Sequence, residues 1–186
     1  DGADRGVAGR EAAGGERRFA VTAAEDPAAL PPADLLVLGL KGHDLPAALP
    51  TIRALLRPET RILSAQNGVP WFFLHGLGGA LDGAVLDSVD RGGALAAALP
   101  AERVLAMVVH AGAMQEAPGV VRLVTANRLP IGGIGAGADA APAVALLRAG
   151  GLPPSGCDQF RGESWRSRAG RTSRKAQGVR RRAGVS

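Results

Sequence analysis

The hydrophobic residues of this chain are concentrated in short, nearly unbroken runs. Residues 35–40, 61–65 and 103–109 are each predominantly apolar and lack the alternation of apolar and polar positions that a half-exposed strand shows. A strand covered on both of its faces needs such a run, and strands of this kind are typical of parallel sheets. The three segments therefore predict neighbouring strands of one parallel sheet.

Segments with a helical period separate these strands. Residues 45–56 place leucine and isoleucine on one helical face, with Pro46 in the first turn, where proline is tolerated. Residues 93–99 predict a short helix, and Asp139 is suited to cap another that runs to about residue 148. Because strands and helices alternate, we expect an α/β domain.

The remaining segments are less regular. Residues 19–22 predict a short strand, and residues 120–125 and 128–131 are spaced like a hairpin. Residues 1–18 show neither the period of a strand nor that of a helix, so we expect them to be disordered. The α/β domain is therefore expected over residues 19–152. Residues 153–186 are expected to be mostly disordered, apart from a polar helical turn near 161–168.

Charge is distributed unevenly along the chain. The formal net charge is +5, but residues 161–186 contain nine basic residues and one acidic residue, whereas the preceding 160 contain thirteen and sixteen. Such a basic tail could attract nucleic-acid phosphates. However, Trp165 is its only aromatic residue, no nucleic-acid-binding module is recognisable, and the body is acidic. We therefore expect a solvated tail and no nucleic-acid partner.

Cysteine content, hydropathy and histidine spacing bear on disulfides, on the compartment and on metal binding. Cys157 is the single cysteine, so the chain cannot form an internal disulfide. No apolar run is long enough to cross a bilayer and no signal peptide is recognisable, which favours a cytoplasmic protein without a membrane partner. His43 and His75 have no metal-ligand spacing with each other or with Cys157, and no metal site is expected.

Polar side chains follow the predicted inner strands at their carboxyl ends, where open α/β sheets bind ligands. Lys41, the only lysine before residue 175, follows the first strand, and Asn67 follows the second. Lys41 could contact an anionic ligand or be an ordinary solvated lysine, and Asn67-Gly68 is also a common turn pair. His110 ends the third strand without an evident carboxylate or serine partner, which favours a structural role.

One glycine pattern invites a nucleotide-binding interpretation. Residues 133–138 read G-x-G-x-x-A between a predicted strand and a predicted helix. The chain contains 27 glycines, and no acidic residue at the end of a strong strand follows about 20 positions further on. A glycine-rich turn before a helix is therefore the favoured interpretation.

Four linked segments resemble the 2-dehydropantoate 2-reductase (ketopantoate reductase) family. They occur in the order and at the spacing of that family, over roughly residues 19–152, and read ADLLVLGLK (33–41), SAQNG (64–68), RVLAMVVHA (103–111) and APGVVR (117–122). The resemblance implies an N-terminal Rossmann domain followed by a helical C-terminal domain, with the active site in the cleft between them. It also places residues 133–138 at a turn late in the first domain.

The same resemblance implies an activity and its site residues. It implies NADPH-dependent reduction of a small 2-oxo acid, 2-dehydropantoate, to pantoate in pantothenate and coenzyme A biosynthesis. Lys41 and Asn67 match family positions at the nicotinamide end of the cofactor NADP, and Gly112 matches a position where the backbone meets the cofactor. These three residues are therefore the candidate cofactor-binding residues.

The chain also departs from the family. The glycine-rich loop that holds the pyrophosphate is missing, so we expect an incomplete Rossmann-like domain. The position of the family's catalytic lysine is occupied by Ser167, which cannot supply a cationic proton donor, and no catalytic residue is assigned. The sequence thus leaves two hypotheses: a reductase that is catalytically incomplete in this chain, or a non-catalytic remnant with weak nucleotide binding.

Overall fold

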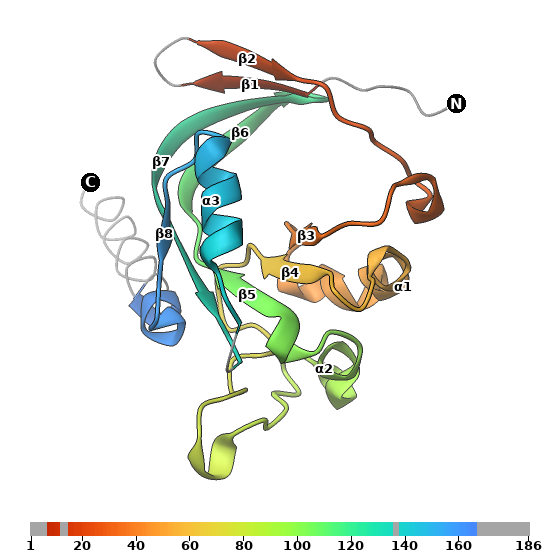
Figure 1. Ribbon diagram of the computed structural model, residues 1–186, viewed down its shortest axis with the longest axis vertical. Coiled ribbons are helices and arrows are strands. Elements are labelled where there is room, and N and C mark those ends of the chain that lie inside the picture. Colours follow the sequence, from red (N-terminus) through yellow and green to blue (C-terminus); the bar gives the residue numbers. More distant parts are fainter. Residues whose placement is uncertain (1–6, 12–14, 136–137, 167–186) are drawn as a thin grey trace, which may run out of the picture.

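A computed structural model describes residues 7–11, 15–135 and 138–166 of the chain. Within these residues eight strands form one curled sheet in the order β2-β1-β7-β5-β4-β3, and β6 and β8 pair with β7 as well (Figure 1). Helices lie on both faces of its inner strands. The predicted α/β class is confirmed.

The inner part of the sheet is parallel, as the apolar runs predicted. Strands β3 (Leu35–Leu38), β4 (Arg61–Ser64) and β5 (Val104–Met107) pair in parallel, with Leu36 opposite Ile62 and Ile62 opposite Val104. All four residues of β5 and the last three of β4 are buried. Because both faces of these strands are covered, their sequences carry no polar alternation.

The outer part of the sheet is a long antiparallel ribbon. Strands β6 (His110–Ala117) and β7 (Val120–Gly133) are joined by a tight turn in which Gly119 has a φ of 74°. The predicted hairpin between residues 120–125 and 128–131 is therefore wrong, since both segments belong to one strand. Strands pair with β7 along its whole length, which keeps the chain extended through the expected turn.

The N-terminal segment also differs from its expectation of disorder. Strand β1 (Val7–Glu11) pairs in parallel with the start of β7, and β2 (Glu16–Phe19) pairs antiparallel with β1. Every residue of β2 is exposed, so this strand is held by its backbone ladder with β1 rather than by a buried apolar face of its own. A search for hydrophobic periodicity could not detect it, and the strand expected at 19–22 lies three residues earlier.

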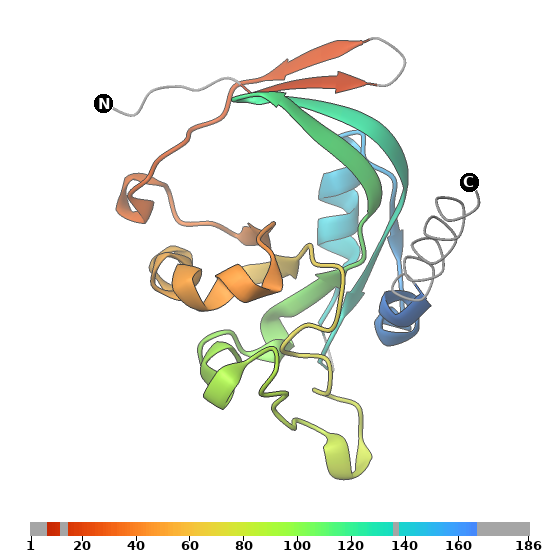
Figure 2. The ribbon, with the colours of Figure 1, turned by 180° about the vertical axis from the view of Figure 1, so that it is seen from behind.

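The helices divide the core into two layers. Helices α1 (Leu45–Leu55) and α2 (Ala94–Ala98) cover one face of the inner strands, and α3 (Ala141–Ala149) covers the other (Figures 1 and 2). The first layer buries residues of α1, α2, the inner strands and the loop after β4, among them Leu45, Ile52, Trp71, Phe72, Leu95 and Leu99. The second layer is smaller and buries Leu63, Leu105, Met107, Leu129, Ile131 and Ala143.

Two aspartates fix the starts of the short helices. Asp139 accepts a hydrogen bond from the Ala141 backbone amide at 2.8 Å, which confirms the predicted cap of α3. Asp90, only 2% exposed, accepts bonds from the amides of Leu95 and Ala96 at the start of α2. These carboxylates satisfy amides that have no partner within their own helices.

The described C-terminal segment contributes more structure than expected. Strand β8 (Pro154–Gly156) pairs in parallel with β7, and residues 160–166 are helical. Phe160 is 6% exposed, with its ring centroid 5.9 Å from that of Phe72. The predicted polar helical turn is thus confirmed as far as residue 166, and the predicted disordered basic tail beyond it lies outside the described residues.

Candidate functional site

The candidate site is the rim formed by the carboxyl ends of β3, β4 and β5. Lys41 lies just beyond β3, in an extended backbone conformation, and its carbonyl accepts a hydrogen bond from the Asp44 amide at 2.9 Å. Its side chain is exposed and makes no hydrogen bond or ion pair within the described part of the chain. The ammonium group is therefore available to an anionic or polar ligand.

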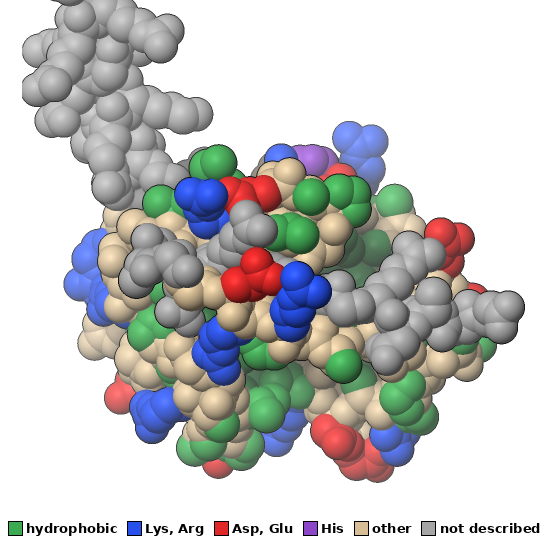
Figure 3. Space-filling model, turned by 90° about the horizontal axis from the view of Figure 1, so that it is seen from above, with side chains coloured by type: hydrophobic (Ala, Val, Ile, Leu, Met, Phe, Trp, Pro, Cys, Tyr) green, Lys and Arg blue, Asp and Glu red, His purple; other side chains and the backbone are tan. Residues whose placement is uncertain are grey.

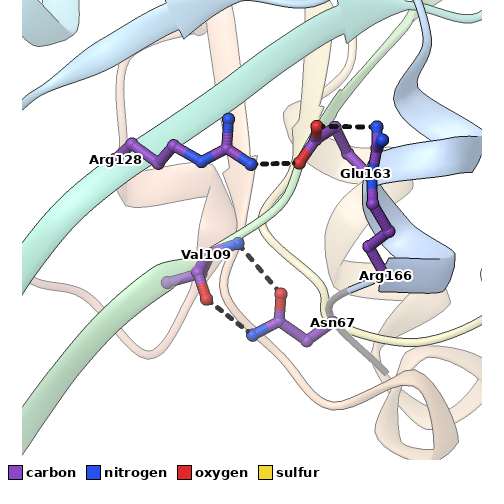
Figure 4. A network of polar contacts seen from close by, with 5 residues as sticks. All are labelled: Asn67, Val109, Arg128, Glu163 and Arg166. Atoms are coloured by element: carbon purple, nitrogen blue, oxygen red, sulfur yellow. Dashed lines mark hydrogen bonds and ion pairs between the residues drawn. The ribbon is translucent and has the colours of Figure 1, made fainter. Parts of the chain in front are cut away.

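Asn67 occupies the end of the neighbouring strand in a different way. Its Nδ2 donates to the carbonyl of Val109 at 2.9 Å, and its Oδ1 accepts from the amide of Val109 at 2.9 Å (Figure 4). This paired contact ties the segment after β4 to the segment after β5. The amide group therefore works as a clasp between two chain segments.

The residues on either side of Asn67 make further ties. The Nε2 of Gln66 donates to the Leu40 carbonyl at 2.8 Å, and its Oε1 accepts from the Ser64 hydroxyl at 3.3 Å. The carbonyl of Gly68 accepts a hydrogen bond of 2.7 Å from the Ser164 hydroxyl. Each residue of the turn 66–68 is thus connected to a different segment.

The helical residues 160–166 lie against this turn. Arg161 donates to the carbonyls of Phe73 and His75 in the loop after β4. Glu163 pairs with Arg128 of β7 and with Arg166, at 2.9 Å for the latter (Figure 4). The segment is therefore fixed to both the loop and the sheet, and it forms a further part of the rim.

The sequence had not singled out Gln66, Glu163 or Ser164 as site residues. Gln66 carried a usable signal, because it is a polar residue directly after a buried strand. The other two lie in a segment without an apolar face, and their partners are 35 and 96 residues away in the chain. Nothing in the local pattern indicated those contacts.

Gly112, the third candidate, lies in the ribbon rather than at a strand end. Its amide donates to the Thr125 hydroxyl at 3.2 Å, and a Cβ at this position would lie 3.2 Å from the same oxygen. Nearby, His110 has a buried Nε2 without a hydrogen-bond partner within the described residues. The structure does not bring Gly112 into the hydrogen-bonded group around Asn67.

The sequence also singled out Ser167 and the histidines His43 and His75. Ser167, which the resemblance places at the position of the family's lysine, lies outside the described residues. The described residues contain no group of three or more His, Cys, Asp or Glu side chains that could hold a metal ion. His75 instead pairs with Glu102, with 3.0 Å between Nε2 and Oε1.

Gly132 and Gly133, at the end of β7, allow the backbone to pack closely there. A Cβ at Gly133 would lie 2.1 Å from the Ala138 carbonyl oxygen, and one at Gly132 would lie 2.2 Å from the Cys157 carbonyl oxygen. No side chain fits at such distances, so the backbone itself requires glycine here. These contacts support the glycine-rich turn rather than a phosphate-binding loop.

Three cavities are lined by none of the candidate residues. A cavity of about 170 Å³ lies between the loop after β4 and the end of α2, beside His75 and Glu102. A second, of about 450 Å³, lies between β7, β8 and the start of α3. A third, of about 400 Å³, lies between α3 and the inner strands. The candidate residues Lys41, Asn67 and Gly112 therefore lie apart from these three cavities.

The surface charges do not gather into one patch on the face seen in Figure 3. Basic and acidic side chains are interspersed there with hydrophobic ones. Within the described residues, no helix is long and apolar enough to cross a membrane.

A curled sheet with a parallel inner part, helices on both faces and a polar rim at the carboxyl strand ends defines a Rossmann-like α/β domain. Residues 3–75 match the family described as ketopantoate reductase PanE/ApbA. Over 99 residues the chain is 42% identical to a 2-dehydropantoate 2-reductase of Mesorhizobium japonicum, covering 53% of this chain and 30% of that protein. The predicted resemblance to the ketopantoate reductase family is therefore confirmed for this part of the chain.

Solved structures give the same result. A candidate ketopantoate reductase from Ralstonia solanacearum MolK2 superposes with a TM-score of 0.78 at 31% identity, over 86% of this chain and 50% of that one. A 2-dehydropantoate 2-reductase from Geobacter metallireducens GS-15 has a TM-score of 0.64 at 22% identity, over 83% and 46%. At that identity the second comparison shows the fold alone. The chain spans at most half the length of these relatives.

Proposed function

We propose that this chain carries one side of the cofactor and substrate cleft of a nicotinamide-dependent reductase that converts a 2-oxo acid to a 2-hydroxy acid. The observation that carries the proposal is the exposed Lys41 at the carboxyl end of β3, beside the turn 66–68, whose side chain has no partner among the described residues. The similarity to 2-dehydropantoate 2-reductases supports 2-dehydropantoate as the substrate and NADPH as the reductant. When bound, the dinucleotide would supply the hydride.

The described residues fit this cofactor in part. Lys41 offers a mobile positive charge, which suits a phosphate or carboxylate. Asn67 is exposed and uses one N–H and one acceptor site of its side-chain amide on Val109, so the second N–H stays available to a ligand. The backbone amide of Gly112 donates to Thr125, so Gly112 would shape the rim rather than bind through that group. Direct contact is therefore expected from Lys41 first and from Asn67 second.

Reduction of the ketone also needs a group that donates a proton to the new hydroxyl. The substrate oxygen gains negative charge as hydride arrives, and a cationic donor stabilises that charge far better than a neutral hydroxyl does. Ser167 occupies the family's lysine position. We therefore propose that this chain binds the cofactor and turns substrate over slowly, and a non-catalytic binding module is the second candidate.

Lysine labelling tests the proposed site directly, because the chain contains only Lys41 and Lys175. We expect NADPH to protect Lys41 from an amine-reactive reagent, measured for each lysine-containing peptide by mass spectrometry, while Lys175 reacts at an unchanged rate. Lys41→Ala should weaken NADPH binding about tenfold, as expected for loss of a charged contact. Arg53→Ala, an exposed position on α1, is the matched control.

The same experiment separates the alternatives. Protection of Lys175 instead of Lys41, abolished by added salt, would assign the binding to the basic tail and contradict the proposal. Binding without turnover of 2-dehydropantoate would favour the non-catalytic module. Turnover at a rate typical of enzymes, on the order of 10 per second, would contradict the claim of an incomplete proton donor.

A further inference from the structure

Gln66 links the two strand ends that form the proposed site. We infer that Gln66 is a positioning residue that holds Lys41 in place for the ligand, an inference that rests on the proposed role of Lys41. Its Nε2 donates to the Leu40 carbonyl at 2.8 Å. That carbonyl shares its peptide group with the amide of Lys41, so the bond fixes the peptide plane from which Lys41 extends.

The segment that carries Lys41 has little else to hold it. Strand β3 pairs only with β4 among the described strands, and its ladder ends at Leu38. Gly39 follows, and a Cβ built there would meet nothing within 4 Å. A glycine in open space leaves the backbone free to take many conformations. The hydrogen bond from Gln66 therefore holds the chain at Leu40, between the unrestrained Gly39 and the turn that begins at Lys41.

Gln66 is itself held from two sides. Its Oε1 accepts from the hydroxyl of Ser64, a residue that is 2% exposed, so the orientation of the side-chain amide is set by a buried group. The next residue, Asn67, clasps the backbone of Val109 with two hydrogen bonds of 2.9 Å. The donor to Leu40 is therefore anchored to β4 and to the end of β5.

This arrangement has a thermodynamic consequence. If the Gln66 bond is absent, ligand binding has to order the segment from Gly39 to Lys41, and that cost opposes the attraction of the ammonium group. Gln66 would then affect affinity only through Lys41. The benefit of Lys41 should therefore depend on the presence of Gln66.

A double-mutant cycle on the full chain tests this dependence, with NADPH affinity measured by fluorescence titration. Gln66→Met keeps the length of the side chain and removes its hydrogen bonds. We expect Lys41→Ala to weaken NADPH binding about tenfold in the wild-type background and less than about threefold in the Gln66→Met background. Equal losses in both backgrounds would overturn the inference and leave the proposed function intact. If Lys41→Ala changes nothing, or no binding is measurable, the proposed site fails and the inference fails with it.

A second readout needs no cofactor. The rate at which Lys41 reacts with an amine reagent, divided by the rate for Lys175 in the same sample, reports the surroundings of Lys41. We expect Gln66→Met to change this ratio and Gln115→Met, an exposed glutamine on β6, to leave it unchanged. Circular dichroism checks that each variant is folded. If Gln66→Met does not fold, Ser64→Ala replaces it as the test variant, because it removes the hydroxyl that orients the Gln66 amide, and it should change the ratio as well. An unchanged ratio in the folded variant would overturn the inference.

Discussion

The inner strands and the β6–β7 ribbon belong to one sheet but are stabilised in different ways. All four residues of β5 are buried between two helical layers, whereas residues 113–117 of β6 are exposed throughout. The inner strands depend on apolar burial and the ribbon on its backbone ladder. A buried strand needs apolar side chains, which are visible in the sequence, whereas backbone hydrogen bonds between strands make no such demand. The inner strands could therefore be predicted from the sequence, and much of the outer sheet could not.

The largest effect is expected from shortening a buried side chain of the inner sheet. Leu105 of β5 is 1% exposed, and Leu105→Ala should lower the free energy of unfolding by about 3 kcal/mol through lost burial and the cavity that remains. Val124→Ala, at a ribbon position that is 44% exposed, should change it by about 0.5 kcal/mol or less. Urea unfolding of both variants measures the difference. Equal losses would contradict the contrast between the two regions.

The two capping aspartates extend the comparison to the helices. Asp90 is buried and caps two amides, whereas Asp139 is exposed and caps one. We expect Asp90→Ala to cost about 2 kcal/mol and Asp139→Ala about 1 kcal/mol, because only the first leaves a buried amide, that of Leu95, unpaired. Thermal unfolding of the two variants gives the order, and a greater loss for Asp139→Ala would refute it.

A smaller effect is expected where the ribbon meets the C-terminal helical segment. The Glu163 carboxylate bridges Arg128 of β7 and Arg166, whose side chains are 53% and 66% exposed. Because these arginines are well solvated, Glu163→Gln should cost no more than about 1 kcal/mol. Its melting temperature should also respond less to added salt than that of the wild type. Glu59→Gln, at an exposed position, is the control; the same salt response in both variants would show that the bridge contributes nothing.

The smallest effect on folding is expected at the edge of the inner sheet, although its effect on association should be clear. The open edge of β3 presents Val37, which is 50% exposed, whereas the other edge of the sheet, β2, has the sequence ERRF. Charged side chains protect a sheet edge from pairing with other chains. Val37→Lys should therefore reduce light scattering on concentration, with little loss of stability. Val85→Lys, at a loop position with 49% exposure, should leave the scattering unchanged. Equal scattering by Val37→Lys and the wild type would argue against association through β3.

The sequence predicted well where burial decided the structure. The runs at residues 35–40, 61–65 and 103–109 contain β3, β4 and β5, and Asp139 caps α3 as expected. The hairpin around Ala126-Asn127 was wrong, because pairing partners distant in the chain override a local turn preference. Strands β1 and β2 were missed since residues 1–18 carry no hydrophobic period, and every residue of β2 is exposed.

The candidate site was predicted at the level of position rather than of contact. Lys41 and Asn67 lie at adjacent strand ends, as the parallel sheet required. The contact of Asn67 with Val109 could not be read from the sequence, because the partner of Asn67 is a backbone group 42 residues away. Residue type indicates which bonds a side chain can form, and the fold decides which of them it does form.

The central position of β7 has a consequence for the order of folding. Its contact with β6 closes a two-residue turn, whereas its contact with β1 joins residues more than 100 positions apart. Closing a long loop costs more chain entropy than closing a short one, and contacts between distant residues slow folding. The β6–β7 ribbon is thus the part of the sheet that can form early and alone. The pairing of β1 with β7 should form later than the pairing of β6 with β7, because it joins residues so far apart in the chain.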